Sequence, residues 1–353
     1  MAEVTLSLDQ FWTLRQQLPV VDARSEGEFE QSHIPGAVNI PILNNAERIT
    51  VGTLYKTAGA EKATLKGFEL VGPRFHLIQK EALRKFPAKK LILYCWRGGM
   101  RSQILSWLLT MVGFEIFRLE GGYKTYRSFT FSWVRKPFPI LILGGSTGAG
   151  KTVLLHQLQE RGEQVIDLEG LANHKGSSFG SIGQAPQPTV EQFENLLAEE
   201  LREMNSNQAI WVENESRRIG RIILPDDFYA QMTESPRIEV EKSEAERIGH
   251  IASEYAHLDQ EELLAAVLRL HKRLGGDRTT QALEAIRAGE SEIWITILLG
   301  YYDKTYEFDL QRHEPSKTIR LNLAGKSLAE QVDLLLQTKP KSNGTSDSVD
   351  GVE

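Results

Sequence analysis

The chain has a single cysteine and no long apolar run, and these two facts exclude whole classes of protein. With Cys95 alone among 353 residues, a disulfide within the chain and a multi-cysteine zinc site are both excluded. No apolar run approaches the roughly 20 residues that a membrane-spanning helix needs. The N-terminus is acidic and carries no basic, apolar signal peptide. We therefore expect a cytoplasmic protein with no membrane partner.

The chain also lacks an excess of positive charge. Its formal net charge is −6, so no global basic field attracts nucleic acid. Any contact with RNA must depend on local clusters of lysine and arginine, although each cluster taken singly is also typical of a solvated surface. The candidate RNA-binding residues are Lys124, Arg127, Arg217, Arg218 and Arg273.

What the chain has is the composition of a soluble globular protein that is long enough for two domains. Hydrophobic residues make up 41% and charged residues 25% of the sequence. We expect an α/β protein in which one parallel α/β domain follows another. The predicted domains are 1–127, with an insertion at 42–87, and 137–335; a structured connector at 128–136 joins them, and a disordered tail occupies 336–353.

The second domain begins with a phosphate-binding motif. An apolar run at 140–143 predicts a buried strand, and a helix is expected at 153–161. The turn between them fits G-x-x-x-x-G-K-[ST] at every position, so backbone N–H groups and one lysine can surround phosphate oxygens. This predicts a diphosphate or triphosphate ligand without specifying a nucleotide. The candidate phosphate-binding residues are Gly145, Ser146, Thr147, Gly148, Ala149, Gly150, Lys151 and Thr152.

Acidic residues follow two further strands expected in this domain. Strands at 164–169 and 209–212 end in carboxylates, where a P-loop protein places a Mg²⁺ partner or meets its second substrate. The usual aspartate is absent, so two glutamates compete for the role. We take Asp167, Glu213 and Glu215 as candidates for Mg²⁺ or substrate contact, and no site for a resident metal is expected. Helices at 245–251, 259–274, 281–288 and 290–305 and a last strand at 318–323 complete the domain.

In the first domain the cysteine occupies a position typical of a ligand site. Cys95 follows an apolar strand at 90–94 and precedes an amphipathic helix at 102–112. The carboxyl end of a parallel strand facing a helix N-terminus is where such sheets hold ligands. Loop N–H groups, Arg97 and Arg101 favour a thiolate and a nearby anion. We therefore predict a cysteine that is both nucleophile and carrier, with Arg97 and Arg101 in the same catalytic loop.

Four segments of this domain resemble the rhodanese family. D-A-R lies at Asp22–Arg24, H-I-P-G-A-x-N-I-P at His33–Pro41, the active-site loop at Cys95–Arg101, and L-x-G-G-Y at Leu119–Tyr123. The resemblance implies that the cysteine carries a persulfide or its selenium analogue, cradled by the loop. It also implies that the residues of the first two segments are scaffold rather than chemistry.

The insertion and the connector are the least informative parts of the sequence. Within 42–87, only 75–85 has the apolar spacing of a helix, and both substrate contact and plain packing remain open as roles for the insertion. At 128–136 aromatic residues alternate with polar ones. A flexible linker would instead be rich in glycine, serine or proline, so we expect a structured connector.

The order and length of the two domains resemble the tRNA 2-selenouridine synthase family, in which a rhodanese domain precedes a P-loop domain. The resemblance spans the chain to about residue 335. The motifs that carry it, besides those above, are H-K-G-S-x-F-G at 174–180, E-x-E-S-R-x-I-G at 213–220 and R-L-G-G at 273–276. It implies replacement of sulfur by selenium in wobble 2-thiouridine of tRNA.

The same resemblance implies the co-substrates and the roles of the two loops. Geranyl diphosphate would place a geranyl group on the sulfur, and selenophosphate would then provide selenium, with a selenophosphate supplier as a candidate partner. Cys95 would carry the selenium, Arg97 and Arg101 would bind the anionic donor, and Lys151 would bind the diphosphate, with Mg²⁺ as a candidate ion.

Two other functions stay open at this point. The first is an ATP-dependent rhodanese-type sulfurtransferase or kinase acting on another acceptor, with a glutamate after the 209–212 strand holding Mg²⁺. The second is a non-enzymatic sensor that uses the first domain to bind anions. The intact Cys95 argues against the sensor, because a binding module does not need a nucleophile.

Overall fold

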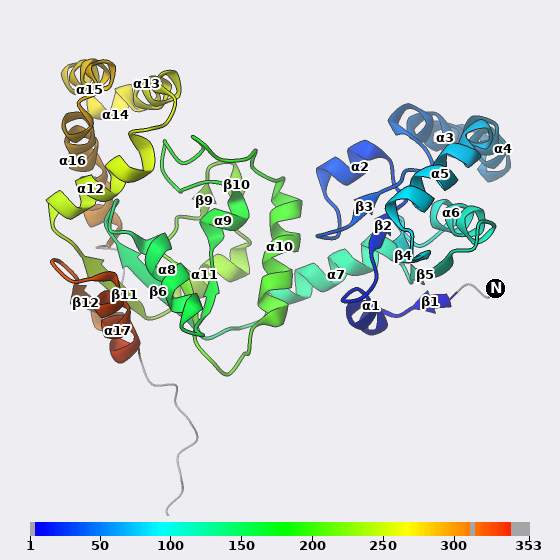
Figure 1. Cartoon of the computed structure of the whole chain (residues 1–353), viewed down its shortest axis with the longest axis horizontal. Helices are drawn as coiled ribbons and strands as arrows, with labels where there is room; N and C mark the ends of the chain where they lie inside the picture. The colour runs from blue at the N-terminus through cyan, green and yellow to red at the C-terminus, as the bar shows by residue number, and fades with distance from the viewer. Residues whose placement is uncertain (1–3, 311–314, 340–353) are drawn as a thin grey trace, which may run out of the picture. The chain divides into compact units, whose positions relative to one another are not determined.

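The computed structural model describes residues 4–310 and 315–339, and these form two compact units (Figure 1). Unit 1 contains the described residues up to Trp133 together with Glu194–Glu199, and unit 2 contains Val134–Phe193 and the described residues from Glu200 onwards. The tail predicted from 336 is in part a helix, because the last helix continues to Thr338; its remainder from 340 to 353 lies outside the described residues. None of the helices described is both long and apolar enough to cross a membrane.

Unit 1 is built on a five-stranded sheet in the order β1-β5-β4-β2-β3, and every pairing in it is parallel. Four of the five residues of β4 are buried, which explains why this strand appears as a continuous apolar run in the sequence. The strands are β1 (Val4–Leu6), β2 (Val20–Asp22), β3 (Val38–Asn39), β4 (Lys90–Tyr94) and β5 (Glu115–Leu119).

Helices occupy two parts of unit 1 whose structure the sequence left undefined. The insertion contains α3 and α4 in addition to the expected helix α5, and residues 128–134, predicted as connector, are the end of helix α7. No residue of α3 is fully buried, so it lacks the apolar periodicity that identifies a helix. The helices are α1 (Leu8–Leu14), α2 (Glu26–Gln31), α3 (Asn45–Ala58), α4 (Ala60–Val71), η1 (Gly72–Arg74), α5 (Phe75–Lys85), α6 (Met100–Thr110) and α7 (Gly122–Val134).

A buried ion pair joins the first signature segment to the last. Arg24 donates to both carboxylate oxygens of Asp22 and to the carbonyl oxygen of Ser32, and both charged side chains are at most 1% exposed. The Arg24 guanidinium also lies 4.1 Å from the centre of the Tyr123 ring. These contacts place Asp22 and Arg24 in the scaffold, as the resemblance implies.

Unit 2 is built on a second parallel sheet, in the order β12-β11-β6-β8-β7. Helix α8 follows β6 directly and packs against β6, β7 and β8. A short antiparallel pair, β9 with β10, lies outside the sheet. The elements are β6 (Ile140–Gly145), α8 (Lys151–Glu160), β7 (Gln164–Ile166), α9 (Leu168–Ala172), α10 (Val190–Glu203), β8 (Ile210–Glu213), β9 (Arg218–Ile219), β10 (Ile222–Ile223), α11 (Asp226–Glu234), β11 (Arg237–Glu241), η2 (Pro315–Lys317), β12 (Thr318–Asn322) and α17 (Leu328–Thr338).

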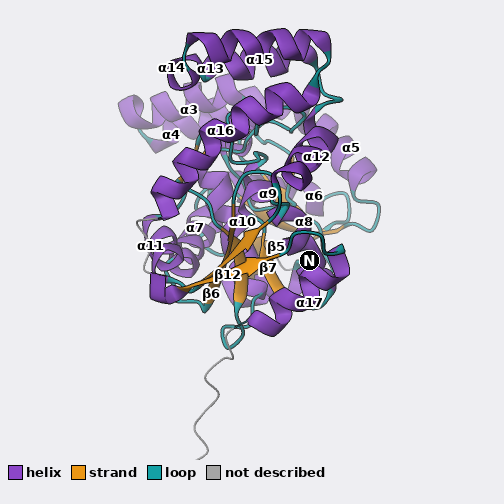
Figure 2. Ribbon diagram, turned by 90° about the vertical axis from the view of Figure 1, so that its left-hand side faces the viewer, coloured by secondary structure: helices purple, strands orange, loops and turns teal. Residues whose placement is uncertain are grey.

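Among the described residues, five α-helices lie between β11 and β12 and form a helical region of unit 2 (Figure 2). Their buried side chains form a core of this region. The additional helices expected from the sequence are therefore present. The predicted helix at 259–274 is divided into α13 and α14. The helices are α12 (Glu244–Tyr255), α13 (Gln260–Arg269), α14 (His271–Leu274), α15 (Gly276–Ala288) and α16 (Ser291–Leu310).

The buried ion pair generates a test of stability. Arg24→Ala leaves the Asp22 carboxylate buried without its partner and should lower the local free energy of unfolding by about 3–5 kcal/mol. The control is Lys90→Gln, because the Lys90–Glu115 pair is about half exposed and should contribute at most about 1 kcal/mol. Native-state hydrogen exchange of the β2 and β4 amides measures both. Equal losses in the two variants would contradict the scaffold role.

Candidate functional site

Backbone hydrogen bonds from the L-x-G-G-Y motif and the residue after it fix the Cys95 loop. The N–H of Tyr123 donates to the Cys95 carbonyl oxygen at 2.9 Å, and the N–H of Lys124 donates to the Trp96 carbonyl oxygen at 3.0 Å. A Cβ atom on Gly122 would collide with the Cys95 carbonyl oxygen, so no other residue fits there. Gly98 has φ +65°, which also favours glycine. The rhodanese-like motifs therefore meet in one place.

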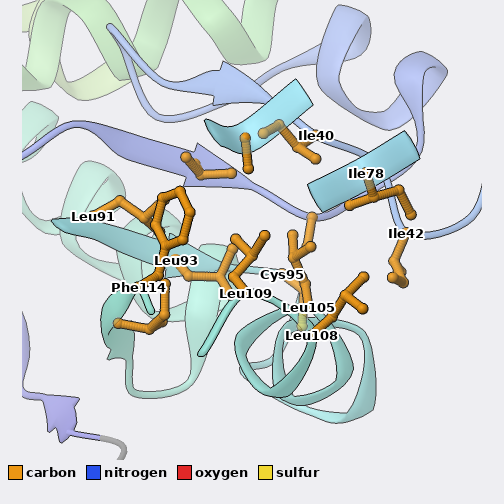
Figure 3. Close-up of a cluster of buried hydrophobic side chains, with 14 of the residues drawn as sticks. Ile40, Ile42, Ile78, Leu91, Leu93, Cys95, Leu105, Leu108, Leu109 and Phe114 are labelled. Carbon is orange, nitrogen blue, oxygen red and sulfur yellow. The ribbon is translucent and has the colours of Figure 1, made fainter. Parts of the chain in front are cut away.

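The Cys95 sulfur lies at the base of this loop, where it is only 3% exposed. Its Sγ atom is 3.2 Å from Ser102 Oγ and 3.8 Å from the Gly99 carbonyl oxygen. Figure 3 shows Cys95 beside Leu105 and Leu108 of α6 in the core of unit 1. Between Cys95 and α6, the backbone N–H groups at 97–99 have no acceptor among the described residues. They are available to an anion bound above the sulfur.

The two arginines of this loop differ in their surroundings. Arg97 is exposed to solvent. Arg101 donates to both carboxylate oxygens of Glu28, at 3.2 Å for the longer bond. Burial would raise the pKa of Glu28, but its hydrogen bond and ion pair with Arg101 outweigh burial and hold the pKa below its usual value. Arg101 can bind a donor anion only by sharing or exchanging this carboxylate.

In unit 2, the turn from β6 to α8 has the geometry of a phosphate-binding loop. Gly148 and Gly150 have φ +82° and +77°, and the N–H groups at 146–148 have no acceptor among the described residues. Arg247 of α12 donates to the Thr147 carbonyl oxygen at 2.8 Å and pairs with Asp303 of α16, which fixes the loop to the helical region. The Lys151 ammonium donates to the Gly145 carbonyl oxygen at 2.9 Å. A bound diphosphate would give the ammonium and the free amides a stronger partner.

A tyrosine of α16 supports the start of this loop. The Tyr306 hydroxyl accepts from the Gly145 N–H at 2.6 Å and donates to the Glu239 carboxylate. Glu239 is buried beside Arg237, and a Cβ atom on Gly144 would collide with its carboxylate. Burial, together with the Glu239 charge, raises the pKa of Tyr306, so the hydroxyl stays protonated.

Three glutamates form a linked group below the phosphate loop. Thr152 Oγ1 donates to Glu169 at 3.3 Å, and the Glu169 N–H donates to Glu213 Oε1 at 2.7 Å. Glu213 is 1% exposed, and burial together with the Glu169 charge raises its pKa well above the usual value. Burial, followed by the Glu169 charge, raises the pKa of Glu215 to about 8, although the nearby Lys151 charge opposes the shift. Glu215 and Glu169 line a cavity of unit 2 that begins at the phosphate loop, whereas Glu213 does not line it.

Asp167, also a candidate, occupies a different place. Its carboxylate accepts from the Gly170 N–H at 2.7 Å as the N-cap of α9 and from His156 at 2.9 Å, and it does not line the cavity. Among the described residues, no group of three or more His, Cys, Asp or Glu side chains is arranged to hold a metal ion. Thr152, Glu169 and Glu215 offer oxygen donors that suit Mg²⁺ only together with ligand phosphate oxygens.

A cavity of about 490 Å³ extends from the phosphate loop into the helical region of unit 2. One end contains Lys151, Thr152 and the two glutamates. The other end is made of aromatic and aliphatic side chains, and the volume falls within the range of about 300–1,000 Å³ that is typical of small-molecule sites. The apolar lining residues are Phe179, Ile251, Tyr255, Trp294, Ile295, Leu298, Leu299, Tyr302 and Phe308.

The H-K-G-S-x-F-G segment borders this cavity. Lys175 pairs with Glu254 at 3.1 Å and lies over the Tyr255 ring. Gly176 has φ +62°, and a Cβ atom there would press on the carboxylates of Glu169 and Glu215. His174 is buried and packs against two other glycines, and burial lowers its pKa. The segment thus brings backbone close to the acidic group.

Comparison with known proteins agrees with this arrangement of two domains. The model of the tRNA 2-selenouridine synthase AAA domain matches residues 138–333, and that of the rhodanese-like domain matches residues 7–128. The chain belongs to the tRNA 2-selenouridine synthase family. A relative named tRNA 2-selenouridine synthase from Sulfurovum sp. (strain NBC37-1) is 36% identical, covering 89% of this chain and 94% of its own length. Another from Pseudomonas fluorescens is 35% identical, with 92% and 96% covered.

For this tRNA 2-selenouridine synthase family member, the structure corrects one RNA-binding candidate. Arg127 is 8% exposed and donates to Asn195 at 2.6 Å and to Glu194, within unit 1. It is therefore not a surface contact for RNA. Lys124, Arg218 and Arg273 are exposed, as is Arg217, which pairs with Asp226; their role in RNA binding stays a prediction.

The raised pKa of Glu215 predicts a pH dependence of stability. The pKa of Glu215 is about 8 in the folded chain and 4.5 in its usual state. Between these two pH values Glu215 is therefore more protonated in the folded chain than in the unfolded chain. Its contribution to stability is complete below about pH 4.5 and is lost as the pH rises through about 8. In urea unfolding between about pH 5.5 and 8.5, Glu215→Gln should lose less stability than the wild type.

The matched control is Glu261→Gln, on an exposed position of α13. It removes one carboxylate without touching the cavity and should keep the wild-type pH dependence. An unchanged pH dependence in Glu215→Gln would contradict the burial of this carboxyl group.

Proposed function

We propose that this protein replaces sulfur by selenium in 2-thiouridine at the wobble position of tRNA. Two half-reactions are involved: geranyl diphosphate first alkylates the sulfur, and selenium derived from selenophosphate then displaces the alkylated sulfur. The names of the relatives support the overall reaction. The two loops support its division, because one provides a phosphate site and the other a nucleophilic sulfur.

The observation that carries the choice of geranyl diphosphate is the composition of the unit 2 cavity. Directly beyond the phosphate loop, side chains such as Ile251, Ile295, Leu298 and Leu299 offer an apolar wall. A geranyl chain has no hydrogen-bonding groups and gains free energy from such a wall. An adenine ring and ribose would bury polar edges there, which costs free energy unless each edge finds a partner.

In the first half-reaction the thiocarbonyl sulfur forms a bond to the geranyl C1 atom as the C1–O bond to diphosphate breaks. Diphosphate departs with the electron pair. Lys151 and the free loop amides stabilise the charge that develops on it. Mg²⁺, held by Thr152, Glu169 and Glu215 together with phosphate oxygens, would neutralise the same charge. The role of the lysine is to hold a leaving group, so no γ-phosphate is required.

In the second half-reaction Cys95 is the selenium carrier. Water cleaves the P–Se bond of selenophosphate and phosphate leaves. The selenide attacks the sulfur of Cys95, which is held as a mixed disulfide with a small-molecule thiol; that thiol departs with the S–S electron pair, and Cys95 carries the selenium as a perselenide above the loop amides. The perselenide attacks C2 of the alkylated base, and geranyl thiolate leaves with the electron pair of the C2–S bond. A small-molecule thiol then reduces the S–Se bond and releases selenouridine. Alkylation makes this route favourable, because a thiolate is a better leaving group than sulfide.

The division of labour is tested by nucleoside mass spectrometry on tRNA that contains 2-thiouridine. Lys151→Ala should lower the rate of geranylation by about 10²–10³-fold, because it removes a charge that stabilises the leaving group. It should still convert tRNA that was geranylated beforehand into selenium-containing tRNA. Cys95→Ala should geranylate at the wild-type rate and yield no selenouridine.

Each variant is the folding control for the other, since each keeps one activity. A variant that loses both activities, or one that keeps both, would contradict the assignment. Hydrolysis of ATP without tRNA, with thiouridine unchanged, would favour the ATP-dependent sulfurtransferase or kinase instead.

Binding of tRNA should depend on salt, because exposed basic residues meet the phosphate backbone. We expect affinity measured by filter binding to fall between about 50 and 200 mM salt. Arg218→Ala should reduce the slope of log affinity against log salt by about 1. The control is Arg161→Ala, an exposed arginine paired with Asp333 and outside the candidate set. Affinity that does not change with salt would exclude this mode of binding.

A further inference from the structure

Unit 1 contains a second cavity, of about 480 Å³, which the chemistry described above does not use. It lies among α3, α4 and the start of α6, so the insertion provides most of its wall. The volume suits a small organic group rather than a single ion. Side chains that form its inner wall include Ile42, Leu43, Val51, Ala63, Val71 and Ile104.

The mouth of this cavity exposes large apolar side chains to solvent. Ile49 is 61% exposed, Phe68 43% and Met100 52%, and all three line the cavity. An apolar hollow that stays open to water is typical of a binding site. The charged residues of the lining, Arg48, Lys56 and Arg101, are all cationic, and Arg48 and Arg101 both pair with the Glu28 carboxylate. An anion attached to an apolar group in the cavity would therefore share or exchange Glu28 as the partner of these arginines.

The cavity adjoins the start of α6, directly after the Cys95 loop. Met100 and Arg101 line it, and they directly follow Gly99, whose carbonyl oxygen lies 3.8 Å from Cys95 Sγ. Ile42, Leu43 and Val71 belong to the same buried cluster as Cys95. An apolar group held in this cavity would therefore be attached to a reacting atom near the sulfur.

We propose that this cavity binds the geranyl chain of S-geranylated tRNA during the selenation step, an inference that rests on the proposed function. The geranyl chain enters the cavity while it is still attached to the base and leaves as part of geranyl thiol. The cationic residues at the mouth face RNA phosphates and the departing thiolate. The protein would thus have two apolar sites, one for the diphosphate donor in unit 2 and one for the alkylated base in unit 1.

The chemistry at this cavity is a substitution at C2 of the base. The selenium anion carried on Cys95 forms the C2–Se bond, the C2–S bond breaks, and the sulfur leaves with the bonding electron pair. The geranyl thiolate takes a proton from water, and a small-molecule thiol reduces the remaining S–Se bond. Holding the geranyl chain fixes the C2–S bond relative to the selenium, which raises the rate of attack.

The cavity offers two positions where it can be filled without removing a contact. Gly67 of α4 and Gly52 of α3 both line it. A Cβ atom on Gly67 would have only Val51, at 3.9 Å, within 4 Å, and one on Gly52 would have nothing. Leucine at either position also favours the helix more than glycine does. Gly67→Leu and Gly52→Leu should therefore fold and fill the cavity.

The test compares two synthetic anticodon stem-loops, one with S-geranyl-2-thiouridine and one with S-methyl-2-thiouridine, given to the full-length protein with selenophosphate and a thiol. The wild type should show a kcat/KM for selenation at least about tenfold higher for the geranyl substrate. Gly67→Leu and Gly52→Leu should lose most of this preference while selenation of the S-methyl substrate stays within about twofold. Geranylation of 2-thiouridine from geranyl diphosphate should be unchanged.

Two apolar truncations and one exposed substitution complete the design. Phe68→Ala removes a lining side chain and should also reduce the preference, whereas Leu65→Ala, on the same helix but outside the lining, should not. Ala58→Leu, on an exposed position of α3, controls for added apolar surface. Absence of the geranyl preference in the wild type, or equal loss on both substrates in the filled variants, would overturn the proposal.

Failure of this inference can be distinguished from failure of the proposed function. The stem-loops are alkylated beforehand, so the cavity is tested without the phosphate loop. If the wild type makes no geranylated nucleoside from geranyl diphosphate but still prefers the S-geranyl substrate, only the first half-reaction fails. If it geranylates normally but selenates both substrates equally, the cavity has another occupant, such as an apolar peptide or a second copy of the chain.

Discussion

Both candidate sites of this protein depend on backbone N–H groups that have no acceptor among the described residues, at points where a parallel strand ends and a helix begins. In the turn after β4 these are the groups at 97–99, and in the turn after β6 those at 146–148. A sheet strand satisfies its amides with its neighbours, and a helix satisfies its own after the first turn. The connection between them is the one place where several donors can converge on an anion. Glycines make this possible, because each turn needs positive φ angles.

The charge of Lys151 in the phosphate loop is coupled to the charges of Glu169 and Glu215. Lys151 is satisfied by a carbonyl oxygen of its own loop, and Glu215 is protonated over much of the neutral range because its pKa is raised. A diphosphate group would attract the lysine, and a cation would favour ionised Glu169 and Glu215. Ligand, lysine and acids are thus electrostatically linked, so occupancy of the loop alters the charge state of the group below it.

The sequence predicted what is local and missed what depends on distant partners. The two loops and most strands were evident because their residues are contiguous and apolar runs mark parallel strands. Helix α3 was missed because it buries no residue fully, whereas α4 was missed although it buries Ala63 and Val71. Arg127 was taken for a surface charge because its partner, Asn195, is 68 residues away. Arg247 and Trp294 reach the phosphate loop and its cavity only through tertiary packing, which no local pattern records.

Each unit has an apolar cavity, and the two cavities suggest a reason for the Cys95 loop and the phosphate loop to occur in one chain. A phosphate loop alone is compatible with many donors, and a reactive cysteine alone is compatible with many acceptors. A chain that alkylates a base and later removes the alkyl group must recognise that group twice, first attached to diphosphate and then attached to RNA. Anion-binding amides cannot do this, because the group is apolar. The α3–α4 insertion and the α12–α16 helical region each add an apolar cavity beside an anion-binding turn. Under the proposed function, a single alkyl intermediate would account for both additions.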